Sequence, residues 1–512
     1  MIHLIAQCAR CGIAEWVCCP SLQSTVFIEE LESCPAAHCW YHADERAAAG
    51  FALARAEATG RPVAIVTGSG SAATSLTPVL VAAYYSRRPL IVITIDSDTP
   101  DGGLGLPGRI EHTGLFGMYA DTINFCLPLA YPDCARIEEL LQEGFPLHLN
   151  LCLGEGVRRG GDYSDLRVGP RPKAPRFRGS LVALSQMLRF REWEGLVLVL
   201  GALDADEHNA VAWLADLLRV PILAEPASNM REQMRQYVLA DADNLLLDNP
   251  PPIVLRFGEV PTGAFWQALE DMPKVEVYSV SRTGFAGLRR QSHVFEGDIE
   301  QIMQALGDIP RRHDPTGLLT LSRRRAARME ELLLAYPESE AALVRAFSHY
   351  AVICDEVCLS GARVSSLWGR YAQSEREFGL VRGINMHSTD GTVSAFLGYS
   401  AARQRACCLA GDVALMRDCA ASTFLPQLEP GLRVVAVLAA DTTDAPEAQI
   451  PSCNLKDLAR LWNAKYIPIC CASDFDAVYD LQDDEFALVE IMPDPQQTRL
   501  FNRGLENPAR TR

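Results

Sequence analysis

The sequence predicts an α/β protein with three doubly wound domains, each built on a parallel sheet. Short continuous apolar runs alternate with helical patterns along the chain, as expected for parallel strands buried on both faces. A length of 512 residues suits about three domains. Two polar stretches with Pro or Gly, 158–178 and 308–316, are expected to be linkers. The expected domains are therefore 1–165, 178–308 and 317–512.

The predicted strands share a continuous apolar character and are bounded by turn residues or helical patterns. They are 62–67, 89–96, 147–153, 196–200, 252–257, 275–280, 406–409, 433–438 and 486–492. An Arg-rich helical stretch follows the second linker.

The composition excludes several classes of protein. A formal net charge of −17 argues against a general nucleic-acid binder, which needs clustered Lys and Arg. There is no apolar run of about 18 residues and no basic start with a cleavage site, so we expect neither a membrane span nor a signal peptide. The 17 cysteines are scattered, and the spacing of Cys8, Cys11, Cys18 and Cys19 is wrong for zinc. Buried thiols in the cytoplasm are the expectation.

Residues 41–60 (YHADERAAAGFALARAEATG) predict an Ala-rich helix with Glu45 in its first turn and Gly60 at its end. Glu45 could simply interact with the positive end of the helix dipole. Alternatively, it could be a buried carboxylate that acts on a heteroaromatic cofactor. The residues alone leave both interpretations open.

Residues 67–71 (TGSGS) follow a predicted strand and precede a helical stretch. Glycines free the backbone, so the amides around Ser69, Gly70 and Ser71 could point at an anionic or polar ligand. A simple tight turn between strand and helix is an equal alternative.

Two predicted strands near the C-terminus, 406–409 and 433–438, run into polar loops. Oxygen ligands at the carboxyl edge of neighbouring parallel strands suit Mg²⁺, whose shell phosphates and waters complete. The candidate metal ligands are Asp412, Asp441 and Thr443. The candidate cofactor contacts here are Gly411, Asp412, Val413 and Ala414. The alternative is that Asp412 only caps the following helix.

Basic residues near these loops could hold a carboxylate substrate, which Arg binds well. Most single Arg residues are nonetheless solvated. The candidates are Arg87, Arg88, Arg109, His112, Arg363, Arg370, Arg382 and His387.

Together these segments resemble the SEPHCHC synthase (MenD) family of menaquinone biosynthesis, which belongs to the thiamine-diphosphate enzymes. The resemblance spans nearly the whole chain and rests on the order and spacing of its motifs. They are HADERAAAGFALARAEATGRPVAIVTGSGSAA (42–73), YYSRRPLIVITID (84–96), TGLFGMYA (113–120), PILAEPASNMR (221–231), VLRFGEVPT (254–262), STDGTVSAFLG (388–398), GDVALMRD (411–418) and FALVEIMPD (486–494).

The resemblance implies three domains of the thiamine-diphosphate-enzyme type. The first would bind the aminopyrimidine ring, the central one would be structural, and the last would bind diphosphate and Mg²⁺ (or Mn²⁺). The active site would form between the first domain of one subunit and the last domain of another, in a homodimer or homotetramer. Glu45 matches the glutamate that hydrogen-bonds the aminopyrimidine. The implied reaction decarboxylates 2-oxoglutarate and adds the resulting carbanion equivalent to isochorismate.

The chain departs from the family pattern at the metal loop and on the substrate side. The family's Asn-Asn pair is missing from 439–443, and Thr389 stands where a bulky aliphatic residue props the cofactor. Gln23 and Ser365 each occupy the place of an Arg, and 107–110 reads PGRI in place of Asn-Gln-Thr-Ile. The candidate substrate-binding residues are Gln23, Arg109, Arg363, Arg382 and His387.

These departures leave three functions open. The first is a working synthase of this family. The second is a catalytically silent paralogue that keeps the fold. The third is a decarboxylase of another 2-oxo acid that protonates its intermediate.

Overall fold

The computed structural model describes most of the chain. The described residues are 1–68, 70–96, 105–108, 110–126, 137–141, 144–153, 160–170, 195–297, 317–384, 390–439 and 454–506. The chain forms two compact units. One comprises Met1–Pro175, Asp390–Ala402 and Arg417–Glu429, and the other comprises Arg176–Thr389, Arg403–Met416 and Pro430–Arg512.

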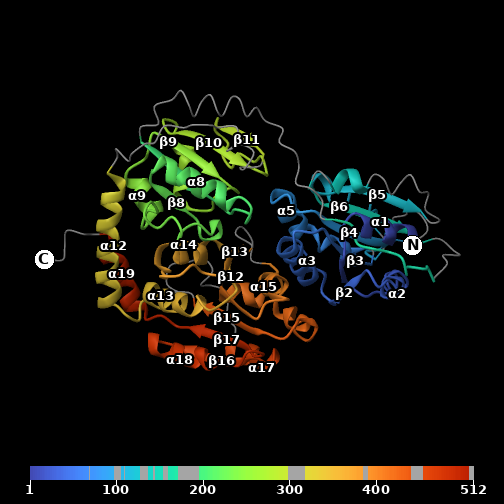
Figure 1. Cartoon of the computed structure of the whole chain (residues 1–512). Coiled ribbons are helices and arrows are strands. Elements are labelled where there is room, and N and C mark those ends of the chain that lie inside the picture. Colours follow the sequence, from blue (N-terminus) through green and yellow to red (C-terminus); the bar gives the residue numbers. More distant parts are fainter. Residues whose placement is uncertain are drawn as a thin grey trace. The chain divides into compact units, whose positions relative to one another are not determined.

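The first sheet lies in the first unit and is coloured blue to cyan in Figure 1. Its described strands have the order β2-β1-β3-β4-β6-β5, and every neighbouring pair is parallel. They are β1 (Glu15–Cys18), β2 (His38–Tyr41), β3 (Val63–Thr67), β4 (Leu90–Asp96), β5 (Asp121–Cys126) and β6 (Leu147–Cys152). The helices along this part are α1 (Ile2–Arg10), α2 (Thr25–Glu32), α3 (Glu45–Thr59), α4 (Ser71–Thr74), α5 (Thr77–Tyr85) and the 3-10 helix η1 (Gly117–Tyr119). The central strands β3 and β4 are buried along their whole length, as the apolar runs predict.

The second sheet lies in the second unit, in green to yellow. Its described strands have the order β11-β10-β9-β7-β8 and are also parallel. They are β7 (Leu196–Leu200), β8 (Ile222–Ala224), β9 (Ile253–Phe257), β10 (Glu276–Ser281) and β11 (His293–Glu296). The helices here are α8 (His208–Leu218), α9 (Ala242–Asp248), α10 (Ala264–Ala268), η2 (Pro226–Ser228) and η3 (Leu269–Asp271).

The third sheet, in orange to red, has the order β13-β12-β14-β15-β17-β16 among its described strands, again parallel. They are β12 (Glu356–Ser360), β13 (Leu380–Ile384), β14 (Arg405–Gly411), β15 (Leu432–Leu438), β16 (Lys465–Ile469) and β17 (Phe486–Ile491). The helices are α12 (Leu318–Ala335), α13 (Glu340–Ala351), α14 (Gly361–Tyr371), α15 (Thr392–Ser400), α16 (Asp412–Met416), α17 (Leu455–Leu461), α18 (Asp476–Tyr479), α19 (Pro495–Glu506), η4 (Cys419–Gln427) and η6 (Ala472–Phe475). Of these helices, α15 and η4 belong to the first unit.

The predicted fold class is confirmed, since the protein has three α/β domains with parallel sheets. Every strand predicted from the sequence is present, and so are the Ala-rich helix (α3) and the Arg-rich helix (α12). The described part of the expected first linker, 160–170, packs on the first unit. Glu30, which is buried, accepts hydrogen bonds from Gly160 N (3.0 Å), Gly161 N (2.8 Å) and Tyr163 Oη (2.7 Å).

Two further features of the described chain bear on the expectations. The described cysteines are free thiols, and most of them are buried. No helix within the described ranges combines the length and the apolar character needed to cross a membrane.

Candidate cofactor site

Each sheet has a topological switch point, at which the strands that come next along the chain are added on opposite sides of the first strand. In the first sheet β2 and β3 lie on opposite sides of β1, and in the third sheet β13 and β14 lie on opposite sides of β12. Ligands of open α/β sheets bind beyond the carboxyl ends of the strands at such a point. The loops after β1, β3, β12 and β14 are therefore the places where ligand-binding residues are expected.

Glu45 lies just beyond β2, at the first position of α3. Asp44 caps the helix by accepting a hydrogen bond from Arg46 N (2.9 Å), and Gly60 ends it in the left-handed conformation. The half-buried Glu45 carboxylate accepts a hydrogen bond from Thr67 Oγ1 (3.3 Å), at the end of β3. Burial, and then the charges of Glu45 and Asp44, raise the pKa of the nearby Cys19 thiol. The carboxylate thus faces the switch point of the first sheet.

The turn after β3 is held closely by neighbouring loops. A Cβ on Gly68 would lie 2.6 Å from Ser21 Oγ and 3.4 Å from Gln23 Oε1, so the loop after β1 packs directly on the turn. Gly70 has φ 77° and ψ −144°, a conformation that side chains rarely adopt, and its Cβ would meet Pro107 O at 2.5 Å. Ser71 N donates to the same carbonyl at 3.1 Å. The structure therefore brings the predicted residues Gln23, Gly70 and Ser71 into one cluster.

Helix α15 and the 3-10 helix η4 pack on α3 within the first unit. A Cβ on Gly50 would lie 2.9 Å from Gly391 O, and one on Gly398 would lie 2.6 Å from Phe51 O, so the two helices approach backbone to backbone. The ring of Phe51 stacks on Phe424 with centroids 3.9 Å apart. This close contact fixes the helix that carries Glu45.

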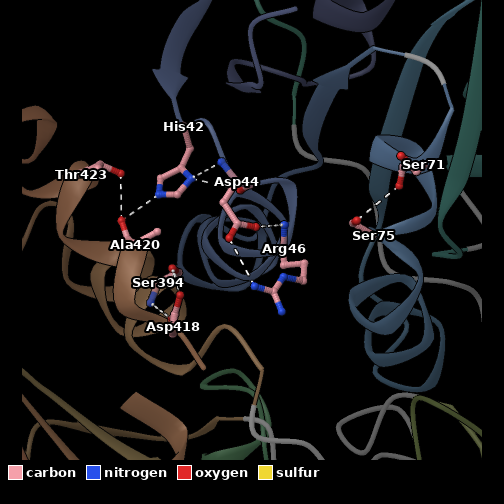
Figure 2. A network of polar contacts seen from close by, with 9 residues as sticks. All are labelled: His42, Asp44, Arg46, Ser71, Ser75, Ser394, Asp418, Ala420 and Thr423. Carbon is pink, nitrogen blue, oxygen red and sulfur yellow. Dashed lines mark hydrogen bonds and ion pairs between the residues drawn. The ribbon is translucent and has the colours of Figure 1, made fainter. Parts of the chain in front are cut away.

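His42 joins the loop before α3 to η4, as Figure 2 shows. Its Nε2 donates to Ala420 O (3.1 Å), and its Nδ1 lies 2.9 Å from Asp44 N and 3.0 Å from Asp44 O. These contacts orient Asp44, which caps α3 beside Glu45.

Asp418, also drawn in Figure 2, is buried at the amino end of α15, next to Ser394. It accepts hydrogen bonds from Ser394 N (2.7 Å) and Ser394 Oγ (2.8 Å). Burial raises the pKa of Asp418 to about 6, although these hydrogen bonds act in the opposite direction. Asp418 was not among the predicted site residues, but a lone Asp after an apolar helical run is a sequence signal that could have singled it out.

In the third sheet, Gly411 ends β14 and pairs with Leu438 at the end of β15. Asp412 begins α16, which is only five residues long, and its Oδ1 accepts a hydrogen bond from Val413 N (2.8 Å). Among the described residues, no atom lies within 4 Å of a Cβ placed on Gly411. The half-buried Asp412 carboxylate and the adjacent space suit a cation with its phosphate ligand.

Two predicted substrate residues have structural partners. Arg363, in the first turn of α14, pairs with Glu340. Arg382 donates to Glu356 (2.8 Å), a fully buried carboxylate at the amino end of β12, away from the carboxyl edge where ligands bind. Among the other basic candidates, Arg370 pairs with Asp241 and Arg87 lies over the Phe145 ring. Arg88 lies 3.8 Å from Glu57, and His112 is buried. Six predicted residues lie outside the described part of the chain: Ser69, Arg109, His387, Thr389, Asp441 and Thr443.

A buried polar ladder crosses β4, β6 and β5 beneath the turn after β3. Asn150 on β6 pairs in register with Thr94 and Asn124, and His148 pairs with Thr122. Thr94, His148 and Asn150 are fully buried. These residues were not predicted to belong to a site, although polar residues at alternate positions of the otherwise apolar segment LHLNLC were an available sequence signal.

The second sheet has its switch point filled by the chain itself. A Cβ on Gly201, after β7, would lie 2.1 Å from Glu259 O, and one on Gly258, after β9, would lie 2.4 Å from Ala202 O. Glu259 N donates to Ala202 O (3.0 Å) across the same place. The two loops occupy the position in which a ligand would otherwise bind.

Comparison with known proteins agrees with this arrangement. Residues 2–115 match the family model described as thiamine pyrophosphate enzyme, N-terminal TPP binding domain. The chain is 40% identical to 2-succinyl-5-enolpyruvyl-6-hydroxy-3-cyclohexene-1-carboxylate synthase of Akkermansia muciniphila, with 98% of each chain covered. It is 27% identical to the synthase of the same name from Bdellovibrio bacteriovorus, over 85% of this chain and 83% of the relative.

Forty per cent identity over nearly the full length of both chains establishes the family. The match to the thiamine pyrophosphate model covers the part of the chain that holds Glu45 and the turn after β3. The chain belongs to the family of 2-succinyl-5-enolpyruvyl-6-hydroxy-3-cyclohexene-1-carboxylate synthases, and it is a thiamine-diphosphate-dependent enzyme of the class that forms carbon–carbon bonds.

Proposed function

We propose that this enzyme is a thiamine-diphosphate- and Mg²⁺-dependent SEPHCHC synthase, which decarboxylates 2-oxoglutarate and joins the product to isochorismate. The observation that carries the proposal is the half-buried carboxylate of Glu45 at the switch point of the first sheet, hydrogen-bonded by Thr67. The name of the relative that shares 40% of its residues with this chain supports the choice of reaction.

The described residues fit the cofactor. Glu45 would accept a hydrogen bond from a protonated ring nitrogen of the aminopyrimidine, which requires that the carboxylate stay ionised. Gly70 and Ser71 would line the same end of the site, with Ser69 between strand and helix. Thiamine diphosphate, when bound, supplies the electron sink that decarboxylation of a 2-oxo acid needs.

The diphosphate end would lie at the third sheet. Asp412 would hold Mg²⁺, or Mn²⁺ in its place, and the open space at Gly411 leaves room for phosphate oxygens. Asp441 and Thr443 would complete the protein ligands, and Gly411, Val413, Ala414 and Thr389 would contact the cofactor. An extra carboxylate at Asp441 is compatible with diphosphate because a cation between them offsets the like charges.

The substrate side would use a small set of basic and polar side chains. Gln23, in the loop after β1, packs against the turn after β3 and could donate to a substrate carboxylate. Arg109 and His387 would supply positive charge, whereas Arg363 and Arg382 would first have to leave Glu340 and Glu356. The assembly would be a homodimer or homotetramer in the cytoplasm, with the site completed by a second subunit. We further propose that the three domains comprise residues 1–165, 178–308 and 317–512.

Calorimetric titration with thiamine diphosphate, with and without Mg²⁺, tests the cofactor site. Glu45→Gln should still bind the cofactor but lose about 100-fold or more in turnover, as expected when a group in proton transfer is removed. Asp412→Asn should weaken the Mg²⁺-dependent binding. Glu375→Gln, which changes an exposed carboxylate elsewhere, is the matched control and should leave both measurements unchanged.

Product analysis separates the alternatives. Carbon dioxide release from 2-oxoglutarate that depends on isochorismate supports the synthase. Release without isochorismate would favour a decarboxylase of a 2-oxo acid. Absence of cofactor binding in the wild-type protein would contradict the proposal and indicate a silent paralogue.

A further inference from the structure

His112 connects the turn after β3 to the buried polar ladder. Its side chain is fully buried, and its two ring nitrogens have different partners. Nε2 lies 3.3 Å from Gly70 N, and Nδ1 lies 2.7 Å from Asn150 Oδ1 and 3.5 Å from Asp96 Oδ2. The imidazole of His112 therefore links the backbone amide of Gly70, in the turn after β3, to the side chain of Asn150 on β6.

The hydrogen-bond partners determine where the protons lie. Gly70 N can only donate, so Nε2 of His112 must be unprotonated and accept. The proton then resides on Nδ1, which donates to Asn150 Oδ1. Asn150 Nδ2 donates in turn to Asn124 Oδ1 (3.0 Å), and Thr94 Oγ1 donates to Asn150 Oδ1 (2.9 Å).

The ladder continues to a second histidine. The Thr94 hydroxyl gives its proton to Asn150, so it accepts one from His148 Nε2 (2.8 Å). His148 Nδ1 then accepts from Thr122 Oγ1 (3.1 Å). Burial, with a smaller effect of His112, lowers the pKa of His148 to about 3, which agrees with a neutral ring. The protons of the ladder can therefore be assigned from His112 to Thr122 without conflict.

Such a ladder is an unusual way to fill the interior of a sheet. Apolar side chains would fill the same volume without the cost of removing polar groups from water, whereas a fully satisfied polar network fixes one geometry. One end of this network holds Gly70 N, in the turn that also contacts Pro107 O through Ser71 N, and another end reaches Thr113 through Asn124. The network therefore fixes the position of the turn relative to the sheet.

We propose that His112, as the neutral Nδ1–H tautomer, is a positioning residue that fixes the Gly70 turn in its cofactor-binding geometry. The proposal rests on the proposed function, in which this turn lines the thiamine diphosphate site. His112 acts through the backbone of Gly70 and does not itself need to touch the cofactor.

The tautomer can be tested without the cofactor. In protein labelled with ¹⁵N-histidine, the resonances of His112 are those lost in His112→Gln. At neutral pH we expect one protonated nitrogen, Nδ1, and one unprotonated nitrogen, Nε2. An imidazolium or the Nε2–H tautomer would overturn the proposal, because neither can accept from Gly70 N.

Affinity for thiamine diphosphate tests the positioning role. His112→Leu keeps a similar volume but leaves Gly70 N without its acceptor, and we expect the dissociation constant to rise about 10-fold or more, which corresponds to about 1.4 kcal/mol. His112→Gln can donate and accept, so it should bind within about threefold of the wild type. Thr122→Val removes the far end of the ladder, and it should lower the melting temperature with little effect on affinity.

The outcomes are distinct. Wild-type affinity in His112→Leu, or an equal loss in Thr122→Val, would show that the histidine serves stability alone and would refute the positioning role. If the wild-type protein itself does not bind thiamine diphosphate, the proposed function fails, and with it the cofactor role of His112. The tautomer measurement would still decide whether His112 holds the Gly70 turn.

Discussion

Replacement of Asp418 by Asn should change how the stability of the first unit depends on pH. Burial raises the pKa of Asp418 to about 6 in the folded protein, against 3.8 for the free group. The folded state therefore binds the proton more tightly than the unfolded state. The free energy of unfolding falls as the pH rises from the unfolded-state pKa of 3.8 to the folded-state pKa of about 6. The full effect is about 1.36 × (6 − 3.8), or about 3 kcal/mol, and about 1 kcal/mol of it falls between pH 5 and pH 7.

The amide introduced by Asp418→Asn would be neutral at every pH and could still serve Ser394, by accepting from its N–H and donating to its hydroxyl. Urea unfolding of wild type and Asp418→Asn at pH 5, 6 and 7 measures the difference, since other titrating groups cancel. We expect the variant to gain about 1 kcal/mol relative to wild type between pH 5 and pH 7. Asp418→Ala should be less stable than Asp418→Asn throughout, because Ser394 loses its partner. A pH-independent difference between wild type and Asp418→Asn would refute the reasoning.

Two further predictions concern packing in the first unit. Gly398→Ala should destabilise the first unit by about 1–3 kcal/mol, because the added Cβ would lie 2.6 Å from Phe51 O and 2.9 Å from Ala54 Cβ. Gly411→Ala is the control: no described atom lies within 4 Å of its added Cβ, so the melting temperature should be nearly unchanged. Equal melting temperatures for these two variants would contradict the close approach of α3 and α15. Glu30→Gln should cost about 1–2 kcal/mol and expose 160–170 to proteolysis, because one amide oxygen cannot replace two carboxylate oxygens that accept from Gly160, Gly161 and Tyr163. Burial raises the pKa of Glu30, but the three hydrogen-bond donors outweigh it, and the pKa is lowered. The greater stability of the wild type over Glu30→Gln should therefore diminish as the pH falls. An unchanged proteolytic cleavage pattern at neutral pH would argue against the contact.

The sequence predicted strands with continuous apolar runs, and it missed most of those in which polar residues interrupt or shorten the run. The strands β1 (EWVC), β2 (HCWY) and β12 (EVCLS) have four or five residues, and each begins with a polar or charged residue. Nothing in such short segments separates a strand from a loop until its neighbours supply the hydrogen bonds. The strands β13 and β16 lie at sheet edges and are only partly buried, so their apolar pattern is weak.

The same limit applies to the site. Glu45 and Gly70 were predictable because helix starts and glycine turns leave local signals in the sequence. The connection from His112 to Asn150 is set by the register of β4, β6 and β5, which no local pattern encodes. The placement of Arg382 against Glu356 is likewise a consequence of strand pairing, and its charge alone suggested a substrate contact.

The three sheets show how one topology supports both binding and purely structural domains. If the described strands of each sheet are numbered 1 to 6 along the chain, the first and third sheets both have the spatial order 2-1-3-4-6-5. The second sheet has the same order, 2-1-3-4, for its first four described strands. The difference lies in the loops at the switch point. Gly201 and Gly258 let two backbones approach so closely that the loops fill the position themselves, whereas no described atom lies within 4 Å of a Cβ placed on Gly411. A glycine after a parallel strand therefore does not by itself indicate a ligand site, because the chain that approaches it decides whether the space remains for a cofactor.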